Sequence, residues 1–189
     1  AYAAARRDVD AVRLFRLAAD AGDSLAMTGL GVMLAQGIGG LPKNEVEAVR
    51  LFRLAADKGD PSAIYGLGFM YAAGLGGTTK NEVEVARLFR LAADKGDTAA
   101  MHRLGVMYEE GRGGLVKNQR EAIRLYRLAA DKGDPNAMVV LAVMHLEGSG
   151  GLAKNDVEAA RLYRLAADKG SPEAMGSLGV MYTAGIGGL

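Results

Sequence analysis

Apolar residues recur along this chain with the spacing of amphipathic helices. Over residues 61–73, positions i, i+3, i+4 and i+7 form one apolar face, made by Ile64, Leu67, Gly68 and Tyr71. Between Asn81 and Gly96, a second face is made by Val85, Leu88, Phe89 and Ala92. The two segments predict a pair of helices, each of which needs a neighbour to cover its apolar stripe.

Helix starts and ends are also marked in the sequence. Asp60-Pro61 predicts a start, because Asp accepts from free N–H groups at the N-cap and Pro is tolerated at the first helical position. Gly74 suits the left-handed residue that ends such a helix. Asn81, with Glu84 three residues on, predicts the cap of the second helix and is close to a capping box. Gly68, in the middle of a helix, predicts the close approach of a neighbouring segment.

The helix pair repeats every 37 residues. The segment Arg-Leu-Phe-Arg-Leu-Ala-Ala-Asp-Lys-Gly-Asp at 50–60 has further copies, and the five copies begin at Arg13, Arg50, Arg87, Arg124 and Arg161. A fixed period of this length is typical of stacked repeat arrays. We therefore predict an all-α solenoid of ten helices without strands, the first near residues 8–21 and the last near 172–184. It forms one domain over 1–189, with units at approximately 6–42, 43–79, 80–116, 117–153 and 154–189.

Two parts of the repeat resemble the tetratricopeptide pattern. Residues 101–108, Met-x2-Leu-Gly-x2-Tyr, follow its first part with Met in place of Trp, and residues 48–52, Ala-x3-Phe, follow its second part. The longer Gly-rich loop, the Leu-Gly-x-Met-Tyr core and the Ala-Ala-Asp-Lys-Gly ending are more similar to the Sel-one-like repeat (SLR) family. This resemblance covers the chain from about Asp8 onward.

The resemblance implies a right-handed superhelix whose Leu-Gly-x-Met-Tyr helices line the concave side, and a role as an adaptor that holds other proteins. Some SLR relatives act in secretory or periplasmic compartments and others in bacterial signalling, so the localisation stays open. Cysteine-rich bacterial relatives are connected with penicillin binding. This chain has no Cys, so we do not extend that activity to it.

Composition and chemistry narrow the function classes further. The net charge is +1, with 23 basic and 22 acidic residues, which argues against nucleic-acid or membrane-surface binding driven by bulk charge. No apolar run approaches the roughly 20 residues that span a bilayer. The Gly-rich loops lack a Gly-Lys-Ser/Thr phosphate motif, and His102 and His145 lie on different repeats without metal-ligand spacing. We therefore expect no enzyme activity, no cofactor and no metal site.

Ten arginines form two ladders in register with the repeat: Arg13, Arg50, Arg87, Arg124 and Arg161, and Arg16, Arg53, Arg90, Arg127 and Arg164. A basic stripe can follow a nucleic-acid backbone. Acidic residues stand nearby, such as Glu47 three positions before Arg50, and favour a salt-bridged, solvated outer face. We expect no nucleic-acid binding.

The repeats differ most on the Leu-Gly-x-Met-Tyr helices. Repeat arrays place changeable side chains on their extended binding surface, although drift at unconstrained sites would give the same variation. The candidate groove residues are Tyr65, Phe69, His102, Arg103, Val106, Glu109, Glu110, Val139, Val143, Leu146 and Glu147. They predict a scaffold that binds a protein or peptide segment with apolar and basic side chains. The alternative is a structural or self-assembling array without a groove ligand.

The first and last predicted helices keep apolar stripes. Near the start, Leu14, Phe15 and Ala18 share a face, and the last helix carries Met175, Leu178, Val180, Met181 and Tyr182. Terminal units of stable arrays usually carry polar capping faces. We therefore expect a piece of a longer array, or end-to-end self-association.

Overall fold

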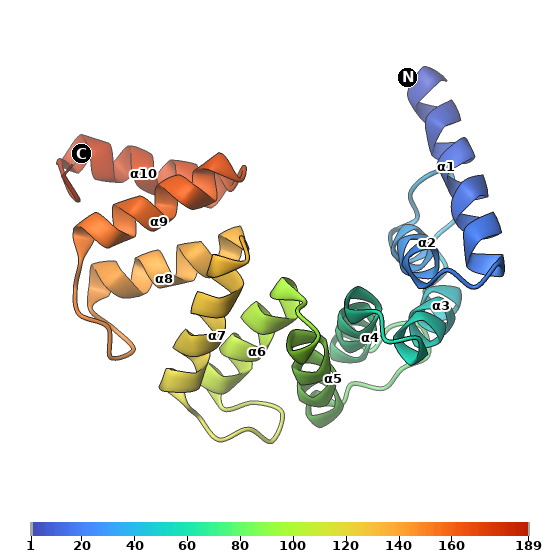
Figure 1. Cartoon of the computed structure of the whole chain (residues 1–189), viewed down its shortest axis with the longest axis horizontal. Helices are drawn as coiled ribbons and strands as arrows, with labels where there is room; N and C mark the ends of the chain where they lie inside the picture. Colours follow the sequence, from blue (N-terminus) through green and yellow to red (C-terminus); the bar gives the residue numbers. More distant parts are fainter. Residues whose placement is uncertain (1, 189) are drawn as a thin grey trace. The chain divides into compact units, whose positions relative to one another are not determined.

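The computed structural model describes the backbone of residues 2–188 and the side chains of residues 10–188. Over this range it contains ten α-helices and no strand (Figure 1). The helices are α1 (Tyr2–Asp20), α2 (Ser24–Gln36), α3 (Glu45–Asp57), α4 (Pro61–Ala73), α5 (Glu82–Asp94), α6 (Thr98–Glu110), α7 (Gln119–Asp131), α8 (Pro135–Glu147), α9 (Asp156–Asp168) and α10 (Pro172–Ala184). The predicted all-α solenoid is confirmed. Helix α1 begins earlier than residue 8, because the Ala- and Arg-rich stretch before it has high helix propensity.

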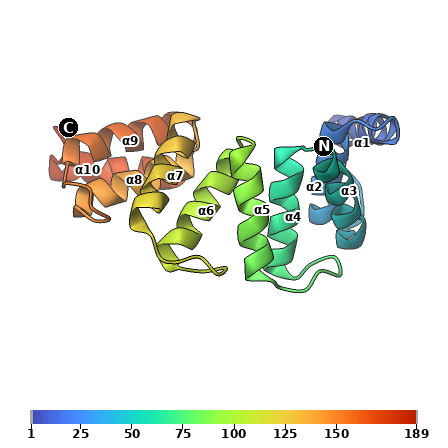
Figure 2. The ribbon, with the colours of Figure 1, turned by 60° about the horizontal axis from the view of Figure 1, so that its bottom comes forward.

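The helices form two compact units, residues 1–97 (unit 1) and residues 98–189 (unit 2). We call α2, α4, α6, α8 and α10 the first helices of the repeats, and α1, α3, α5, α7 and α9 the second helices. In unit 1, consecutive helices pack as α1 on α2, α2 on α3, α3 on α4 and α4 on α5. In unit 2, α6 packs on α7, α7 on α8, α8 on α9 and α9 on α10 (Figure 2). Among the described helices, none combines the length and apolarity that crossing a membrane requires.

The predicted caps are present. The Asp60 carboxylate accepts from the N–H groups of Ser62 and Ala63, and Gly74 ends α4 with a φ of 69°. The Asn81 side chain accepts from Glu84 N at 3.1 Å. The Glu84 carboxylate does not complete a capping box, because its two oxygens accept from Arg87 Nε at 2.8 Å and Nη2 at 2.7 Å.

One joint repeats through the core: an aromatic ring of a second helix packs against a glycine of a first helix. Phe52 is buried between α2 and α4, and a methyl group on Gly31 or Gly66 would lie 2.8 or 3.1 Å from its Cε1. A methyl group on Gly68 would lie 2.7 Å from Cε1 of Phe89. The predicted close approach at Gly68 is therefore confirmed, and we call this contact the ring–glycine joint.

Candidate binding surface on the first helices

A cavity opens on unit 1 between two successive first helices. It measures about 380 Å³ and is lined mainly by α2 and α4, with Phe52, Leu75 and Asp97 completing its wall. The apolar lining from the two helices includes Val32 of α2 and Tyr65 and Phe69 of α4. Neither α2 nor α4 contains a charged residue, so the cavity is apolar except for a few polar groups at its edge.

Two predicted site residues, Tyr65 and Phe69, lie at this cavity. The Tyr65 ring stacks on Phe89 of α5, with ring centroids 5.5 Å apart and an angle of 28° between the planes. The neighbouring helix therefore holds Tyr65 in place. Phe69 is 49% exposed, although it is a large apolar side chain on a helix that otherwise packs well. Exposed aromatic rings beside a cavity are typical of binding surfaces.

The polar groups of the cavity are tied to the helix starts. Thr28 Oγ1 donates to Asp60 Oδ2 at 2.8 Å and to the Ser24 carbonyl at 3.0 Å. Ser62 Oγ donates to Asp97 Oδ2 at 3.2 Å. Asp97 is the one charged side chain among the described residues that line the cavity. The edge near Asp97 is thus suited to a cationic or hydrogen-bond-donating group.

In unit 2, His102 occupies the repeat position of Tyr65. Its ring tilts against Tyr126 of α7, with centroids 5.7 Å apart and an angle of 45°. Burial lowers the pKa of the His102 imidazole, the Asp134 carboxylate opposes this shift, and the Arg103 guanidinium adds to it. Burial thus disfavours the charged form of this half-buried ring, which lies against the aromatic ring of the following second helix as Tyr65 does.

Glu109 is bound inside unit 2. Tyr126 Oη donates to its Oε2 at 2.9 Å, and Gln119 Nε2 donates to its Oε1 at 3.1 Å. Burial first, and then this carboxylate, raise the pKa of the Tyr126 hydroxyl far above its ordinary value. The negative charge of Glu109 is thus held by α7, and its direct role is in the joint between α6 and α7.

The remaining candidates in unit 2 differ in accessibility. Val139 is 5% exposed, so its side chain belongs to the core and offers no free surface. Val106, Val143 and Leu146 are half-buried, and Arg103, Glu110 and Glu147 are exposed. Glu110 Oε2 pairs with Arg112 Nη1 at 3.0 Å. The accessible candidates of unit 2 are therefore three apolar side chains and three charged ones, with His102 partly covered.

Sequence reasoning missed several residues of the unit 1 cavity. Val32 stands at the repeat position of Phe69. Asp97 stands at the repeat position of Asp60, just as Tyr65 stands at the repeat position of Thr28. These equivalences could have identified Val32 and Asp97 from the sequence. The interior positions of Phe52 and Leu75 carry no such signal, because they look like core residues in the sequence.

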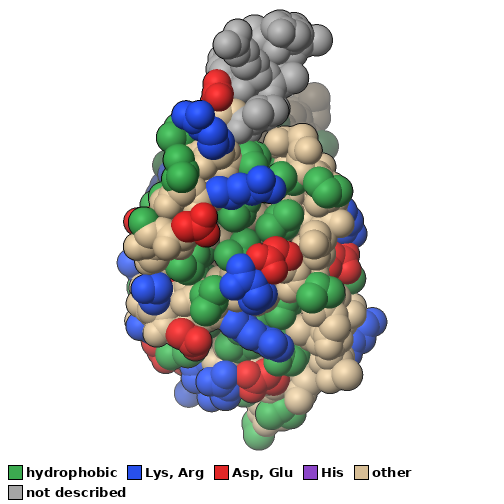
Figure 3. Space-filling view, turned by 90° about the vertical axis from the view of Figure 1, so that its right-hand side faces the viewer, with side chains coloured by type: hydrophobic (Ala, Val, Ile, Leu, Met, Phe, Trp, Pro, Cys, Tyr) green, Lys and Arg blue, Asp and Glu red, His purple; other side chains and the backbone are tan. Residues whose placement is uncertain are grey.

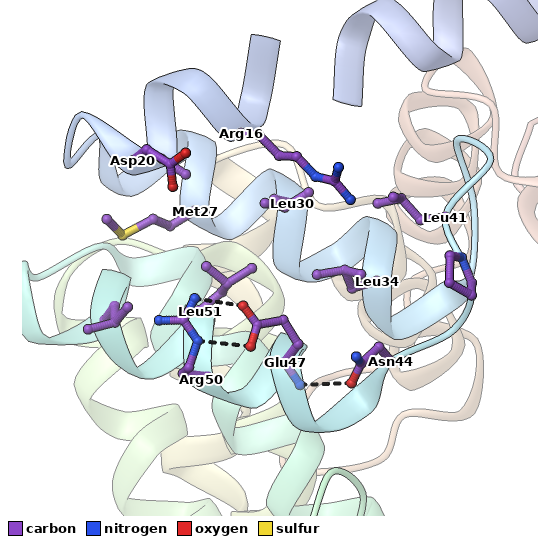
Figure 4. A pocket seen from close by; sticks show the side chains of 13 residues that line it. Arg16, Asp20, Met27, Leu30, Leu34, Leu41, Asn44, Glu47, Arg50 and Leu51 are labelled. Atoms are coloured by element: carbon purple, nitrogen blue, oxygen red, sulfur yellow. Dashed lines mark hydrogen bonds and ion pairs between the residues drawn. The ribbon is translucent and has the colours of Figure 1, made fainter. Parts of the chain in front are cut away.

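Four arginines of the first ladder form ion pairs with a glutamate three positions earlier. Arg50 Nε and Nη2 donate to Glu47 at 2.8 and 2.6 Å (Figure 4). Equivalent two-bond pairs join Arg87 to Glu84, Arg124 to Glu121 and Arg161 to Glu158. On the face seen in Figure 3, basic and acidic side chains are interspersed among apolar ones. These pairs match the salt-bridged outer face predicted from the sequence.

A model of the Sel1 repeat matches residues 8–23, 24–60, 61–97, 98–134 and 135–171. A Sel1 repeat protein from Oxalobacter formigenes is 33% identical, with a TM-score of 0.79 over 93% of this chain and 70% of that one. A protective antigen of uropathogenic Escherichia coli with an SLR fold is 34% identical, with a TM-score of 0.75 over 92% of this chain and 36% of that one.

A Pseudomonas aeruginosa immunity protein shares the fold at 24% identity and a TM-score of 0.64, over 86% of this chain and 58% of that one. None of the curated protein sequences is similar to this chain. Each full matched repeat contains a first helix followed by a second helix. The units predicted above pair the helices the other way, with a second helix followed by a first helix.

Proposed function

This chain belongs to the Sel1 repeat family, whose members are typically protein-interaction scaffolds, and we propose that it binds a polypeptide segment on its first helices without catalysing a reaction. The proposed ligand is a protein or peptide segment with apolar and basic side chains. No cofactor takes part in this function. The binding energy comes from a few anchor side chains in a preformed surface.

The exposed Phe69 ring beside the unit 1 cavity is the observation that most supports this proposal. At about 380 Å³ the cavity is within the range of ordinary ligand pockets, and it can take a large apolar side chain. Asp97 at its edge favours a ligand that carries a basic residue near that apolar anchor. Burying Phe69 against such a side chain would remove its exposed apolar surface from water.

Unit 2 carries a set of candidate contacts of its own. Apolar contact comes from Val106, Val143 and Leu146. Polar groups are supplied by His102 and Arg103, and the carboxylates that attract basic side chains are Glu110 and Glu147. Glu109 contributes negative charge from a fixed position. Val139 only shapes the surface from beneath, because its side chain is buried.

We expect Phe69→Ala to weaken peptide binding at least about tenfold, because truncating a buried aromatic anchor commonly costs more than 1 kcal/mol of binding energy. The probe is a set of peptides selected from a random phage-displayed library on the wild-type chain. Affinities are measured by fluorescence anisotropy. The selected peptides should share an apolar residue next to Lys or Arg.

The matched control is Val83→Ala. Val83 is an exposed apolar residue on α5 that does not line the cavity. It should leave peptide affinity unchanged. Equal affinities for wild type and Phe69→Ala, or peptides without a basic residue, would contradict the proposed binding mode. A library that yields no binder would contradict the proposed function itself.

We also expect no saturable binding of single- or double-stranded oligonucleotides at about 0.15 M salt, because carboxylates pair with four ladder arginines and the net charge of +1 gives little attraction. Fluorescence anisotropy with labelled oligonucleotides measures this. Gln substitutions at Glu47, Glu84, Glu121 and Glu158 serve as a positive control, since they free the ladder and should produce weak, salt-dependent binding. Tight and steeply salt-dependent binding by the wild type would overturn the expectation.

A further inference from the structure

In the ring–glycine joint, a second helix packs on the first helix that precedes it in the chain. A methyl group on the glycine would lie 2.8 Å from the ring at Gly31–Phe52, 2.7 Å at Gly68–Phe89 and 2.6 Å at Gly105–Tyr126. Each joint lies within one unit and is buried. At these three joints the glycine leaves room for the ring, whereas α8 carries Ala142 at this position and Tyr163 is still buried.

Helix α10 presents the same surface without a ring against it. Gly179 stands at the repeat position of Gly68 and Gly105, and no atom of the described residues would lie within 4 Å of a methyl group there. Met175 is 52% exposed, whereas Met138, its equivalent on α8, is 4% exposed. Tyr182 is also exposed. The exposed face of α10 is thus an apolar surface with a glycine notch at its centre.

Helix α1 presents the complementary surface. Leu14 is 60% exposed, whereas Leu51 at the same position of α3 is 4% exposed. Phe15 occupies the ring position, and a methyl group on Gly29 would lie 3.0 Å from its Cε1. Phe52, by contrast, touches glycines on both of its sides. Over residues 10–20, the ring-bearing helix α1 therefore has one covered and one uncovered side.

The charges beside these two faces, on α9 and α1, are complementary as well. The hydrogen bond to Glu47 is the main cause that raises the pKa of Arg50, and the Asp20 carboxylate on the preceding second helix adds to it. In unit 2, the hydrogen bond to Glu158 raises the pKa of Arg161, and the Asp131 carboxylate adds to it. When a further second helix packs on α10 in the way that α3 packs on α2, Asp168 comes next to the residue of that helix at the repeat position of Arg13. Both side chains are exposed.

We propose that the exposed face of α10 binds α1 of a second copy of this chain, with Phe15 of one copy in the glycine notch at Gly179 of the other. The occupant is a second copy because α1 carries the ring, the leucine and the arginine that the internal joints use. The contact joins two different surfaces, so copies add head to tail. This proposal does not depend on peptide binding at the unit 1 cavity.

Sedimentation velocity and light scattering across a wide concentration range test this proposal. The wild-type mass should rise with concentration beyond that of a dimer. Gly179→Leu fills the notch and Leu14→Glu puts a charge on the facing side, and each should raise the dissociation constant at least about tenfold. Both positions are open to solvent, so both variants should keep the wild-type circular dichroism spectrum.

A mixture of the two variants gives the sharpest result. Gly179→Leu keeps an intact α1 and Leu14→Glu keeps an intact α10, so one productive joint remains and the mixture should form dimers but no longer assemblies. Val157→Glu, an exposed site on α9, is the control and should associate like the wild type. A wild type that stays monomeric at all concentrations, variants that still associate, or a mixture that forms no dimer would overturn the proposal.

Discussion

Replacing Gly68 by leucine is expected to lower the free energy of unfolding of unit 1 by about 3 kcal/mol, at the upper end of what overpacking of a core usually costs. A methyl group at this position would already lie 2.7 Å from Cε1 of Phe89 and 3.4 Å from Cβ of Leu88. The Phe89 ring is buried, so it cannot move aside into solvent. Urea denaturation followed by circular dichroism measures the loss, and hydrogen exchange locates it in α4 and α5.

Gly179→Leu is the matched control, because it makes the same change at the same repeat position. Among residues 10–188, no neighbour lies within 4 Å of the added Cβ, so the variant should gain up to about 1 kcal/mol from the better helix propensity of leucine. The opposite signs separate the packing effect from the propensity effect. Equal losses at both sites would mean that the close approach at Gly68 does not limit stability.

The parts of the fold that depend on local chemistry could be predicted from the sequence. The repeat period, the Asp60 and Asn81 caps and the left-handed Gly74 are set by residues within one or two turns of each other. Gly68 also indicated the close approach of a neighbouring segment, since glycine is unfavourable in the middle of a helix unless packing requires it. The start of α1 was missed because it lies outside the repeat register.

The candidate site was predicted only in part, because exposure depends on neighbours that lie far away in the sequence. Val139 varies among the repeats as Tyr65 and His102 do, yet its side chain is buried. Variation at one position thus includes both surface changes and core substitutions of different size. The unit 1 cavity needs α2 and α4 together, and no single repeat reveals it.

Glu109 shows most clearly how variation among repeats can have an internal cause. It is bound to Tyr126, and the residues at these two positions are Ala35 with Phe52, Ala72 with Phe89, Glu109 with Tyr126 and Leu146 with Tyr163. The carboxylate occurs with one of the two tyrosines and with neither phenylalanine, so the sequence alone does not assign it to the joint. The hydrogen bond from Tyr126 Oη to Glu109 Oε2 at 2.9 Å makes that assignment.

Tyr126→Ala is expected to destabilise unit 2 by about 4 kcal/mol, because it removes a fully buried ring and leaves a cavity. Tyr126→Phe should cost only about 1–2 kcal/mol, since the ring remains and Glu109 loses one of its two donors. The double variant Tyr126→Phe/Glu109→Ala recreates the pairing of Ala72 with Phe89 and should recover most of that smaller loss. Urea denaturation of the wild type, Tyr126→Phe, Glu109→Ala and the double variant forms a double-mutant cycle. A double variant as unstable as the sum of its single changes would show that the hydroxyl and the carboxylate contribute independently, contrary to this account of Glu109.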